Sequence, residues 1–132
     1  MKRGKGLKTL KAKAWKLFSE YVRRKHADSF GFTTCYTSGL RSHWKDLQCG
    51  HAIPGRTNAV LFDESICRPQ SVSENIFKRG NYPVFTTNLI KENGMEWWEG
   101  KLLQSRKPVK LTRDDLQHTI SKYQSLLDKL GK

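Results

Sequence analysis

Apolar residues recur at steps of three and four along the first part of the chain, which is the pattern of an amphipathic helix. No glycine or proline interrupts residues 7–26, and most of the nearby lysines fall on the opposite face. We therefore predict a helix over residues 7–26 that packs its apolar stripe on the domain and turns its basic face toward phosphate. The stripe consists of Leu7, Leu10, Ala14, Leu17, Phe18, Tyr21 and Val22.

The middle of the chain lacks helical periodicity and is rich in turn-forming pairs. Its apolar residues predict two short strands, over residues 47–51 and 66–68, joined by a loop. Ser71 and Glu74 have the spacing of a capping box, which predicts a short helix over residues 73–79. The order strand, loop, strand, short helix is a ββα unit.

The last third of the chain is predicted to be helical. A first-turn proline and a following glycine bound a helix over residues 83–93, and another helix is predicted over residues 95–104. Thr112 opens the last helix, and Asp115 lies three residues later, where an acid favours the helix N-terminus. The apolar face of this last helix consists of Leu116, Ile120, Tyr123, Leu127 and Leu130.

These elements predict an α+β fold in a single domain over residues 1–132. A basic N-terminal helix occupies residues 1–30, a ββα core residues 31–82, and C-terminal helices residues 83–132. A chain of this length builds one modest core rather than two.

The charge of the chain indicates a polyanionic partner. Lysine and arginine number 25 against 12 acids, which gives a net charge of +13 on 15.3 kDa. The basic residues concentrate near the N-terminus, and clustered basic charge is typical of nucleic-acid binding that weakens steeply with salt. The predicted DNA contacts are Lys13, Lys16, Arg23 and Arg24 on the first helix and Arg56, Arg68, Lys78 and Arg79 in the centre.

Cellular location is indicated by three negative features of the sequence. No apolar run approaches the roughly 20 residues that span a bilayer, so no membrane association is expected. The basic N-terminus has no apolar segment behind it, as a secretory signal would have. Three cysteines without a dense framework suit a reducing compartment. We therefore expect a cytoplasmic protein.

A set of central residues has the chemistry needed to cut a phosphodiester. The reaction needs an activated water, a cation beside the phosphate and positive charge to hold the backbone. His51 ends the first predicted strand and can act as general base. Asn75 lies in the first turn of the short helix, where it can hold a divalent cation. Lys78 is three residues further on and is expected to face the same phosphate.

Five segments of the chain share the pattern of one family: Cys35-Tyr-Thr-Ser-Gly, Trp44-Lys-Asp-Leu-Gln-Cys-Gly-His51, Leu61-Phe-Asp-Glu64, Arg68-Pro-Gln70 and Glu74-Asn-Ile-Phe-Lys-Arg-Gly-Asn81. In these segments the chain resembles the NinG (Rap) proteins of lambdoid phages, and the resemblance covers nearly its whole length. The Gly-His and Asn-x-x-Lys-x-Gly-Asn elements are its specific parts.

The resemblance implies a phage or prophage endonuclease of the HNH (ββα-metal) superfamily that acts on branched recombination intermediates, including Holliday junctions. It also implies Mg²⁺, or Mn²⁺, as cofactor. The same resemblance implies that His51 is the general base, Asn75 a metal ligand and Lys78 a phosphate contact. A second protein ligand is not defined by the pattern, and Asp63 is our first choice for it.

The sequence departs from the family pattern at its zinc knuckles. The resemblance implies two Cys-x-x-Cys pairs, but here the corresponding residues are Cys35 with Ser38 and Ser71 with Glu74. Structural zinc takes about four thiolate or imidazole ligands, so we expect no zinc at this position. A capping box formed by Ser71 and Glu74 is our hypothesis for what supports the knuckle instead.

Further departures fall on the two strands and beside His51. Ile66 stands where the superfamily has an asparagine that pins the loop, and Gly50 stands where many members have a metal ligand. Cys49 and Cys67 lie on the two predicted strands, where their side chains can meet. Buried thiols that pack as small apolar groups are the favoured interpretation, and a disulfide is the alternative.

Two other classes of function compete with a nuclease. A non-catalytic, basic DNA-binding protein on a decayed HNH scaffold is favoured by the lost cysteines and Ile66, but not by the retained His51 and Asn75. A basic RNA- or ribosome-associated protein explains the charge alone. Because a four-way junction is nearly two-fold symmetric, a homodimer is also an option. The apolar face of the last helix then serves as its interface or, equally, as ordinary core.

Overall fold

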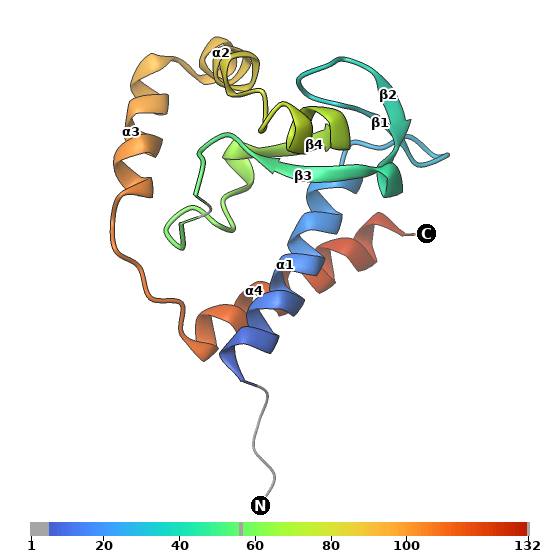
Figure 1. Ribbon diagram of the computed structural model, residues 1–132. Coiled ribbons are helices and arrows are strands. Elements are labelled where there is room, and N and C mark those ends of the chain that lie inside the picture. Colours follow the sequence, from blue (N-terminus) through green and yellow to red (C-terminus); the bar gives the residue numbers. More distant parts are fainter. Residues whose placement is uncertain (1–5, 56, 132) are drawn as a thin grey trace, which may run out of the picture.

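The computed structural model describes residues 6–55 and 57–131, and these form an α+β architecture (Figure 1). Its longest helices, α1 (Leu7–Arg24) and α4 (Arg113–Leu130), lie side by side. Two small antiparallel hairpins and the helices α2 (Tyr82–Asn93) and α3 (Met95–Ser105) complete the fold. Within the described ranges, no helix is both long enough and apolar enough to cross a bilayer.

The predicted amphipathic faces of α1 and α4 pack against each other. Leu10 and Ala14 of α1 are buried with Leu116 of α4. Further along, Phe18 contacts Tyr123 edge to face, with 5.1 Å between ring centroids. Leu116, Tyr123 and Leu127 of the last helix are therefore core of this chain, whereas Leu130 is 40% exposed. The homodimer stays a prediction.

Helix α4 begins as its sequence predicts. The Thr112 hydroxyl accepts a hydrogen bond from the Asp115 N–H at 3.1 Å, and the Asp115 carboxylate accepts one from the Thr112 N–H at 2.9 Å. This reciprocal capping box satisfies two N–H groups at the helix start, which otherwise lack intrahelical partners. The capping box therefore fixes where α4, the helix that packs on α1, begins.

The predicted hairpin is present at the centre of the molecule. Strand β3 (Leu47–His51) pairs antiparallel with β4 (Cys67–Ser71), and His51 lies opposite Cys67. A single π-helical turn, η3 (Ser73–Phe77), follows β4 directly. The predicted order of strand, loop, strand and short helix is therefore confirmed, although the helix is shorter than the predicted 73–79.

A second hairpin was not predicted from the sequence. Strand β1 (Phe32–Thr34) pairs with β2 (Arg41–His43), and a 3₁₀ turn, η1 (Trp44–Asp46), links β2 to β3. These strands are short and carry few apolar residues, so they give no period-two signal.

The core lies between α1, the β3–β4 hairpin and the C-terminal helices. Burial of aromatic and aliphatic side chains supplies most of the free energy that stabilises such an arrangement. Phe85 and Leu89 of α2 and Trp98 of α3 anchor the second half of the chain to this core. The other buried members are Phe18, Val22, Cys49, Ala52, Ile53, Val60, Ile66, Cys67 and Tyr123.

Candidate active site

His51 ends β3 and is almost entirely buried, with 7% of its surface exposed. Its Nε2 lies 3.0 Å from the Leu61 carbonyl oxygen, which accepts a hydrogen bond when Nε2 carries the proton. In that neutral tautomer the lone pair is on Nδ1. The loop between the strands thus orients the ring and selects the nitrogen that can act as a base.

Trp15 of α1 covers one face of the His51 ring. The two rings are stacked, with 5.1 Å between centroids and 19° between planes. The contact joins residues 36 positions apart and makes the N-terminal helix a wall of the site. The helix that was predicted to pack on the domain and contact phosphate therefore also fixes the candidate base.

Asn75, in η3, lies at the same cavity as His51. This cavity, here called the His51 cavity, has a volume of about 130 Å³. The Asn75 Nδ2 donates a hydrogen bond to Gln48 Oε1 at 2.8 Å, so its Oδ1 is the amide atom that can accept or ligate. The structure therefore brings together two of the predicted site residues. The cavity is lined by Trp15, Cys49, His51, Ile53, Pro54, Gly55, Asn75 and Tyr82.

A second cavity of about 390 Å³ adjoins the first and shares Trp15, Cys49 and Asn75 with it. Three of its wall residues, Trp15, Ser19 and Arg23, lie four residues apart on one face of α1. The Arg23 Nε donates to the Ser19 carbonyl at 3.0 Å. Burial lowers the pKa of Arg23, but an arginine stays protonated at neutral pH, so this cavity has one fixed cation.

Asp63, the predicted second metal ligand, does not line the His51 cavity. It caps a 3₁₀ turn by accepting a hydrogen bond from the Ser65 N–H, and it pairs with Lys101 Nζ at 2.7 Å. Burial raises the pKa of Asp63, but the hydrogen bonds from Lys101 and Ser65 outweigh it and the net pKa is lowered. In this structure Asp63 ties α3 to the loop, and its role as a metal ligand stays a prediction.

Two arginines predicted to contact DNA are engaged within the protein. The Arg68 guanidinium donates to the backbone carbonyls of Glu64, Ser65 and Cys67 and lies 5.1 Å from the Tyr36 ring centroid. Arg68 therefore holds the turn before β4, and its contact with DNA stays a prediction.

Arg24 is the second engaged arginine. It pairs with Glu20 at 2.8 Å and donates to the Gly131 carbonyl at 2.9 Å, so its charge is partly neutralised. It joins the end of α1 to the end of α4, away from the His51 cavity. Arg56 lies outside the described residues.

The cations around η3 differ from the expected arrangement. Lys78 was expected to face the same phosphate as Asn75, one α-helical turn away. Because η3 is a π-helical turn that ends at Phe77, Lys78 follows it and pairs with Glu74 at 2.9 Å. Lys78 does not line the His51 cavity, although 60% of its side chain is exposed. Arg79 is exposed and has a left-handed backbone, with φ of 50°.

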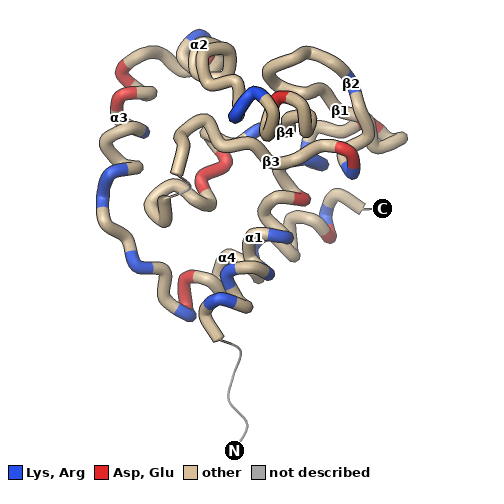
Figure 2. Tube along the Cα trace, viewed as in Figure 1, with Lys and Arg blue, Asp and Glu red and all other residues tan. Residues whose placement is uncertain are grey.

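The exposed lysines of α1 agree with a phosphate-binding face. Lys13 and Lys16 are exposed and flank Trp15 in the sequence. Figure 2 marks lysine and arginine positions in blue along α1. Lys13 and Lys16 therefore lie on the exposed side of α1, and their contact with a DNA backbone stays a prediction.

The position of the expected zinc knuckle is occupied by a hydrogen-bond cluster, here called the knuckle. The Cys35 sulfur accepts from the Ser71 N–H at 3.2 Å, and the Ser71 hydroxyl accepts from the Glu74 N–H at 3.2 Å. The Glu74 carboxylate, 2% exposed, accepts from Asn81 Nδ2 at 2.8 Å. Its members are Cys35, Thr37, Gln70, Ser71, Glu74 and Asn81.

The knuckle changes the pKa of two of its members. Hydrogen bonds from Asn81, Thr37 and Lys78 lower the pKa of Glu74 to about 2. Burial raises the pKa of Cys35, but hydrogen bonds from Ser38, Ser71 and Thr37 outweigh it and lower the value to about 7. With one thiol and a carboxylate engaged in hydrogen bonds, these donors do not fit a structural zinc site.

The capping-box hypothesis is half correct. The Ser71 hydroxyl does accept from the Glu74 N–H, but the Glu74 carboxylate faces Asn81 and Lys78 instead of returning to Ser71. The carboxylate therefore closes the far end of the turn. It links η3 to the start of α2, which a capping box would not do.

Gly50 is explained by its neighbour on the paired strand. A Cβ at residue 50 would lie 1.9 Å from Gln70 Oε1, so no side chain fits there. Gln70 is fully buried and donates from Nε2 to Thr37 Oγ1 at 3.0 Å and to the Gly80 carbonyl at 2.8 Å. The position that holds a metal ligand in many HNH proteins is thus filled by a buried amide.

The cysteines of the hairpin are buried free thiols, as the favoured interpretation held. Burial raises the pKa of Cys67, and the adjacent Cys49 raises it further, so both pack as small apolar groups. Ile66 is buried in the same core, and its carbonyl accepts from the Ala52 N–H at 2.9 Å. Packing and this backbone bond therefore hold the loop at Ile66.

Comparison with known proteins supports one assignment. A family model described as bacteriophage Lambda NinG protein matches residues 2–132 of the chain. The chain belongs to the NinG family. No curated protein and no solved structure matches it. Membership of the NinG family therefore rests on the whole length of the chain.

Sequence reasoning missed Trp15, Gln48 and Tyr82 as walls or supports of the His51 cavity. Trp15 had a signal, since it is a large aromatic at the edge of the apolar stripe of α1, three residues before Phe18 and seven before Val22. Gln48 precedes Cys49 on β3, so its side chain points to the face of the strand opposite that of Cys49. Nothing in the local sequence of Tyr82 distinguishes it from a core aromatic.

Proposed function

We propose that this member of the NinG family is a metal-dependent DNA endonuclease that acts on branched recombination intermediates such as Holliday junctions. In this proposal β3, β4 and η3 form an HNH-type ββα-metal core. The supporting features are the phage family, the net charge of +13 and the cavity at the end of β3.

The observation that carries the proposal is the pairing of His51 and Asn75 at one cavity. His51 has one nitrogen at the Leu61 carbonyl and stacks on Trp15, and Asn75 has its amide nitrogen on Gln48. Each functional group is thus oriented by a second contact, which is the preorganisation that catalytic sites need.

The proposed reaction is the in-line attack of water on phosphorus. His51 Nδ1 takes a proton from water, the resulting hydroxide forms the new P–O bond, and the bond to the leaving 3′- or 5′-oxygen breaks. The exposed Lys13 and Lys16 bind the flanking phosphates. A divalent cation bound through Asn75 Oδ1, with water and phosphate oxygens, would supply positive charge to the leaving oxygen.

The donor set of the cavity fits such a cation in part. An amide oxygen is a ligand of the kind that Mg²⁺ takes, and Mg²⁺ keeps several waters and commonly shares its shell with phosphate. Among the described residues, no group of three or more His, Cys, Asp or Glu is placed to hold a metal. Binding of the cation is therefore proposed to depend on the DNA.

A second candidate function is non-catalytic DNA binding on an HNH scaffold. The observation that favours it is the lining of the His51 cavity, which has no carboxylate among its described residues. The same basic surface would then hold junctions without cutting them.

One experiment separates the two functions. A labelled four-way junction and a linear duplex of matching sequence are incubated with Mg²⁺, Mn²⁺ or EDTA and with wild type, His51→Ala or His118→Ala. His118 is exposed on α4 and serves as the matched control. The nuclease proposal predicts junction cleavage by wild type and His118→Ala that His51→Ala and EDTA abolish. Tight junction binding without cleavage by any protein would support the second candidate and overturn the first.

A further inference from the structure

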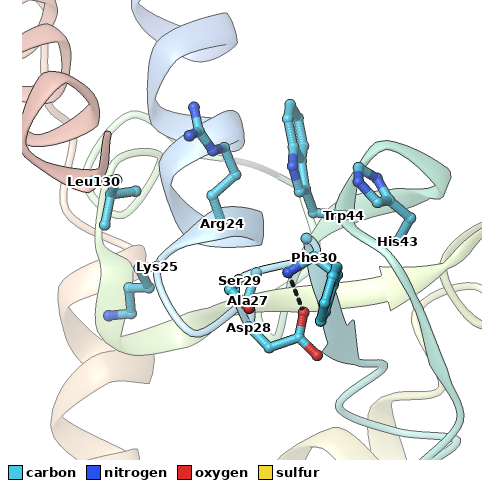
Figure 3. Close-up of a pocket in the computed structure, with 10 residues that line it drawn as sticks. Arg24, Lys25, Ala27, Asp28, Ser29, Phe30, His43, Trp44 and Leu130 are labelled. Carbon is cyan, nitrogen blue, oxygen red and sulfur yellow. Dashed lines mark hydrogen bonds between the residues drawn. The ribbon is translucent and has the colours of Figure 1, made fainter. Parts of the chain in front are cut away.

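A pocket of about 350 Å³ lies at the C-terminal end of α1. The turn before β1 and the end of β2 form its other walls. Figure 3 shows Lys25 and Leu130 on one side of it and Phe30 and His43 on the other, with Arg24 at its upper edge. Its size falls in the range of small-molecule sites, about 300 to 1,000 Å³.

The pocket is bordered by aromatic rings. His43 and Trp44 rings are 5.8 Å apart and 30° from parallel, and the Phe32 ring meets His43 edge to face at 5.6 Å. Phe30 is 81% exposed. A phenylalanine this exposed beside further aromatic surface marks a binding site more often than an isolated exposed residue does.

Positive charge surrounds the same rings. The guanidinium carbons of Arg23 and Arg24 each lie 5.2 Å from the Trp44 ring centroid, and Lys45 Nζ lies 5.8 Å from it. The acid in the pocket wall, Asp28, is paired with Arg41 at 2.6 Å. Arg24 and Lys25 are paired with Glu20 at 2.8 Å and Glu64 at 3.3 Å, two acids that do not line the pocket. The pocket therefore presents flat apolar surface within a cationic rim.

The turn that carries Phe30 is held in place. Asp28 Oδ1 accepts from the backbone N–H groups of Phe30 and Phe32, both at 2.9 Å, and the first of these bonds is drawn in Figure 3. Gly31 has φ of 87°, and a Cβ there would lie 2.4 Å from His43 Nε2. The exposed ring is therefore presented by a built turn rather than by a loose end.

We propose that this pocket binds an unpaired nucleotide of the DNA, with its base on Phe30, His43 and Trp44 and its phosphate at Arg24 and Lys25. Aromatic rings in a positive groove are how proteins hold single-stranded nucleic acid irrespective of sequence. A base within a duplex is stacked on both faces and cannot enter. The pocket thus selects DNA with unpaired nucleotides.

The pocket lies within reach of the His51 cavity on one DNA molecule. Trp15 and Arg24 are nine residues apart on α1, which is about 14 Å along a helix, or about four steps of a DNA strand at about 3.4 Å each. Arg23 lies between them, since it lines the cavity next to His51 and also faces Trp44. The inference rests on the proposed function for its DNA partner and adds the feature of DNA that is recognised.

The test compares binding of three labelled DNAs at one salt concentration by fluorescence anisotropy. They are a twelve-residue oligothymidylate, a fork with unpaired arms and a fully paired duplex. The variants are Phe30→Ala and, as a matched control, Phe77→Ala, whose side chain is also exposed, at 79%, but lies on η3. Circular dichroism checks that each variant is folded.

We expect Phe30→Ala to weaken binding of the oligothymidylate and the fork by about tenfold, with less than a twofold change for the duplex and for Phe77→Ala on every DNA. Equal weakening on all three DNAs, or no change with Phe30→Ala, would overturn the pocket. Cleavage by wild type and its loss in His51→Ala are measured separately, so failure of the pocket and failure of the nuclease proposal give different results.

Discussion

Two neighbouring residues of η3, Glu74 and Asn75, belong to polar clusters that use their groups in opposite ways. In the knuckle the Glu74 carboxylate is enclosed by hydrogen bonds from Asn81, Thr37 and Lys78. At the His51 cavity, Asn75 uses its nitrogen for orientation, on Gln48, and keeps its oxygen at the cavity wall. One turn of the chain therefore has two roles: Glu74 stabilises the hairpin from one face, and Asn75 serves the proposed catalysis from another.

The first prediction concerns a substitution that changes the His51 cavity and leaves the knuckle intact. We expect Asn75→Ala to lower the single-turnover rate of junction cleavage by about 100-fold, because a cation on the scissile phosphate stabilises the transition state by several kcal/mol. Unfolding by urea should change by less than about 1 kcal/mol, since Asn75 is half-buried and loses one side-chain bond. Asn93→Ala, which removes an exposed amide at the end of α2, is the control. A rate unchanged by Asn75→Ala would remove this residue from the site.

The second prediction concerns a substitution that changes the knuckle and leaves the His51 cavity intact. Glu74→Gln leaves Asn81, Thr37 and Lys78 without their charged acceptor at a buried position, so we expect the free energy of unfolding at pH 7 to fall by about 2 kcal/mol. Cleavage measured well below the unfolding temperature should change by no more than a few-fold. Glu96→Gln on α3, where the side chain is exposed, is the control for removing one charge.

The stability lost in Glu74→Gln has a defined pH dependence. The pKa of Glu74 is lowered from 4.5 to about 2 in the folded protein. Its contribution to stability is therefore present in full above the unfolded-state pKa and is lost as pH falls from about 5 toward 2. Wild type and Glu74→Gln should converge in stability over that range. A difference between them that stays constant from pH 7 to pH 3 would show that the carboxylate charge is not what stabilises the knuckle.

The third prediction concerns Gln48, which orients the Asn75 amide at the His51 cavity. Gln48→Ala removes the acceptor that orients the Asn75 amide, and loss of an outer partner of a metal ligand commonly costs about 10-fold in metal affinity or activity. We expect the Mg²⁺ concentration for half-maximal cleavage to rise by about that factor, while the rate at saturating Mg²⁺ recovers. A fall in rate at all Mg²⁺ concentrations, with an unchanged half-maximal point, would give Gln48 a merely structural role.

The smallest effect is expected on the basic face of α1. Lys13→Ala and Lys16→Ala should each weaken junction and duplex binding by a few-fold and to the same extent, because phosphate contacts carry no sequence or branch information. Each should also reduce the slope of log affinity against log salt by about 0.9. Lys129→Ala, near the end of α4, should leave the slope unchanged.

Elements dictated by local pattern could be predicted from the sequence, whereas contacts between distant segments could not. The stripe of α1, the cap at Thr112 and the strand that ends at His51 all follow from spacing along the chain. Pairing of Trp15 with His51 depends on how α1 crosses the hairpin, which no local pattern encodes.

Asp63, Arg68 and Lys78 show what the sequence does not reveal about charged side chains. Each was assigned to metal or DNA from its position in the sequence, whereas the fold gives each a partner within the protein: Lys101 for Asp63, backbone carbonyls for Arg68 and Glu74 for Lys78. The last of these follows from a π-helical turn, whose spacing differs from the α-helical spacing that was assumed.

The most direct test of the division between chemistry and support measures His51→Gln and Glu74→Gln side by side, by melting temperature and by single-turnover junction cleavage at saturating protein. Glutamine at residue 51 can still donate to the Leu61 carbonyl but has no basic nitrogen. We predict that His51→Gln loses cleavage by at least about 100-fold with little change in melting temperature, and that Glu74→Gln melts lower but still cuts. Undiminished cleavage by His51→Gln, or its complete loss in folded Glu74→Gln, would contradict the account.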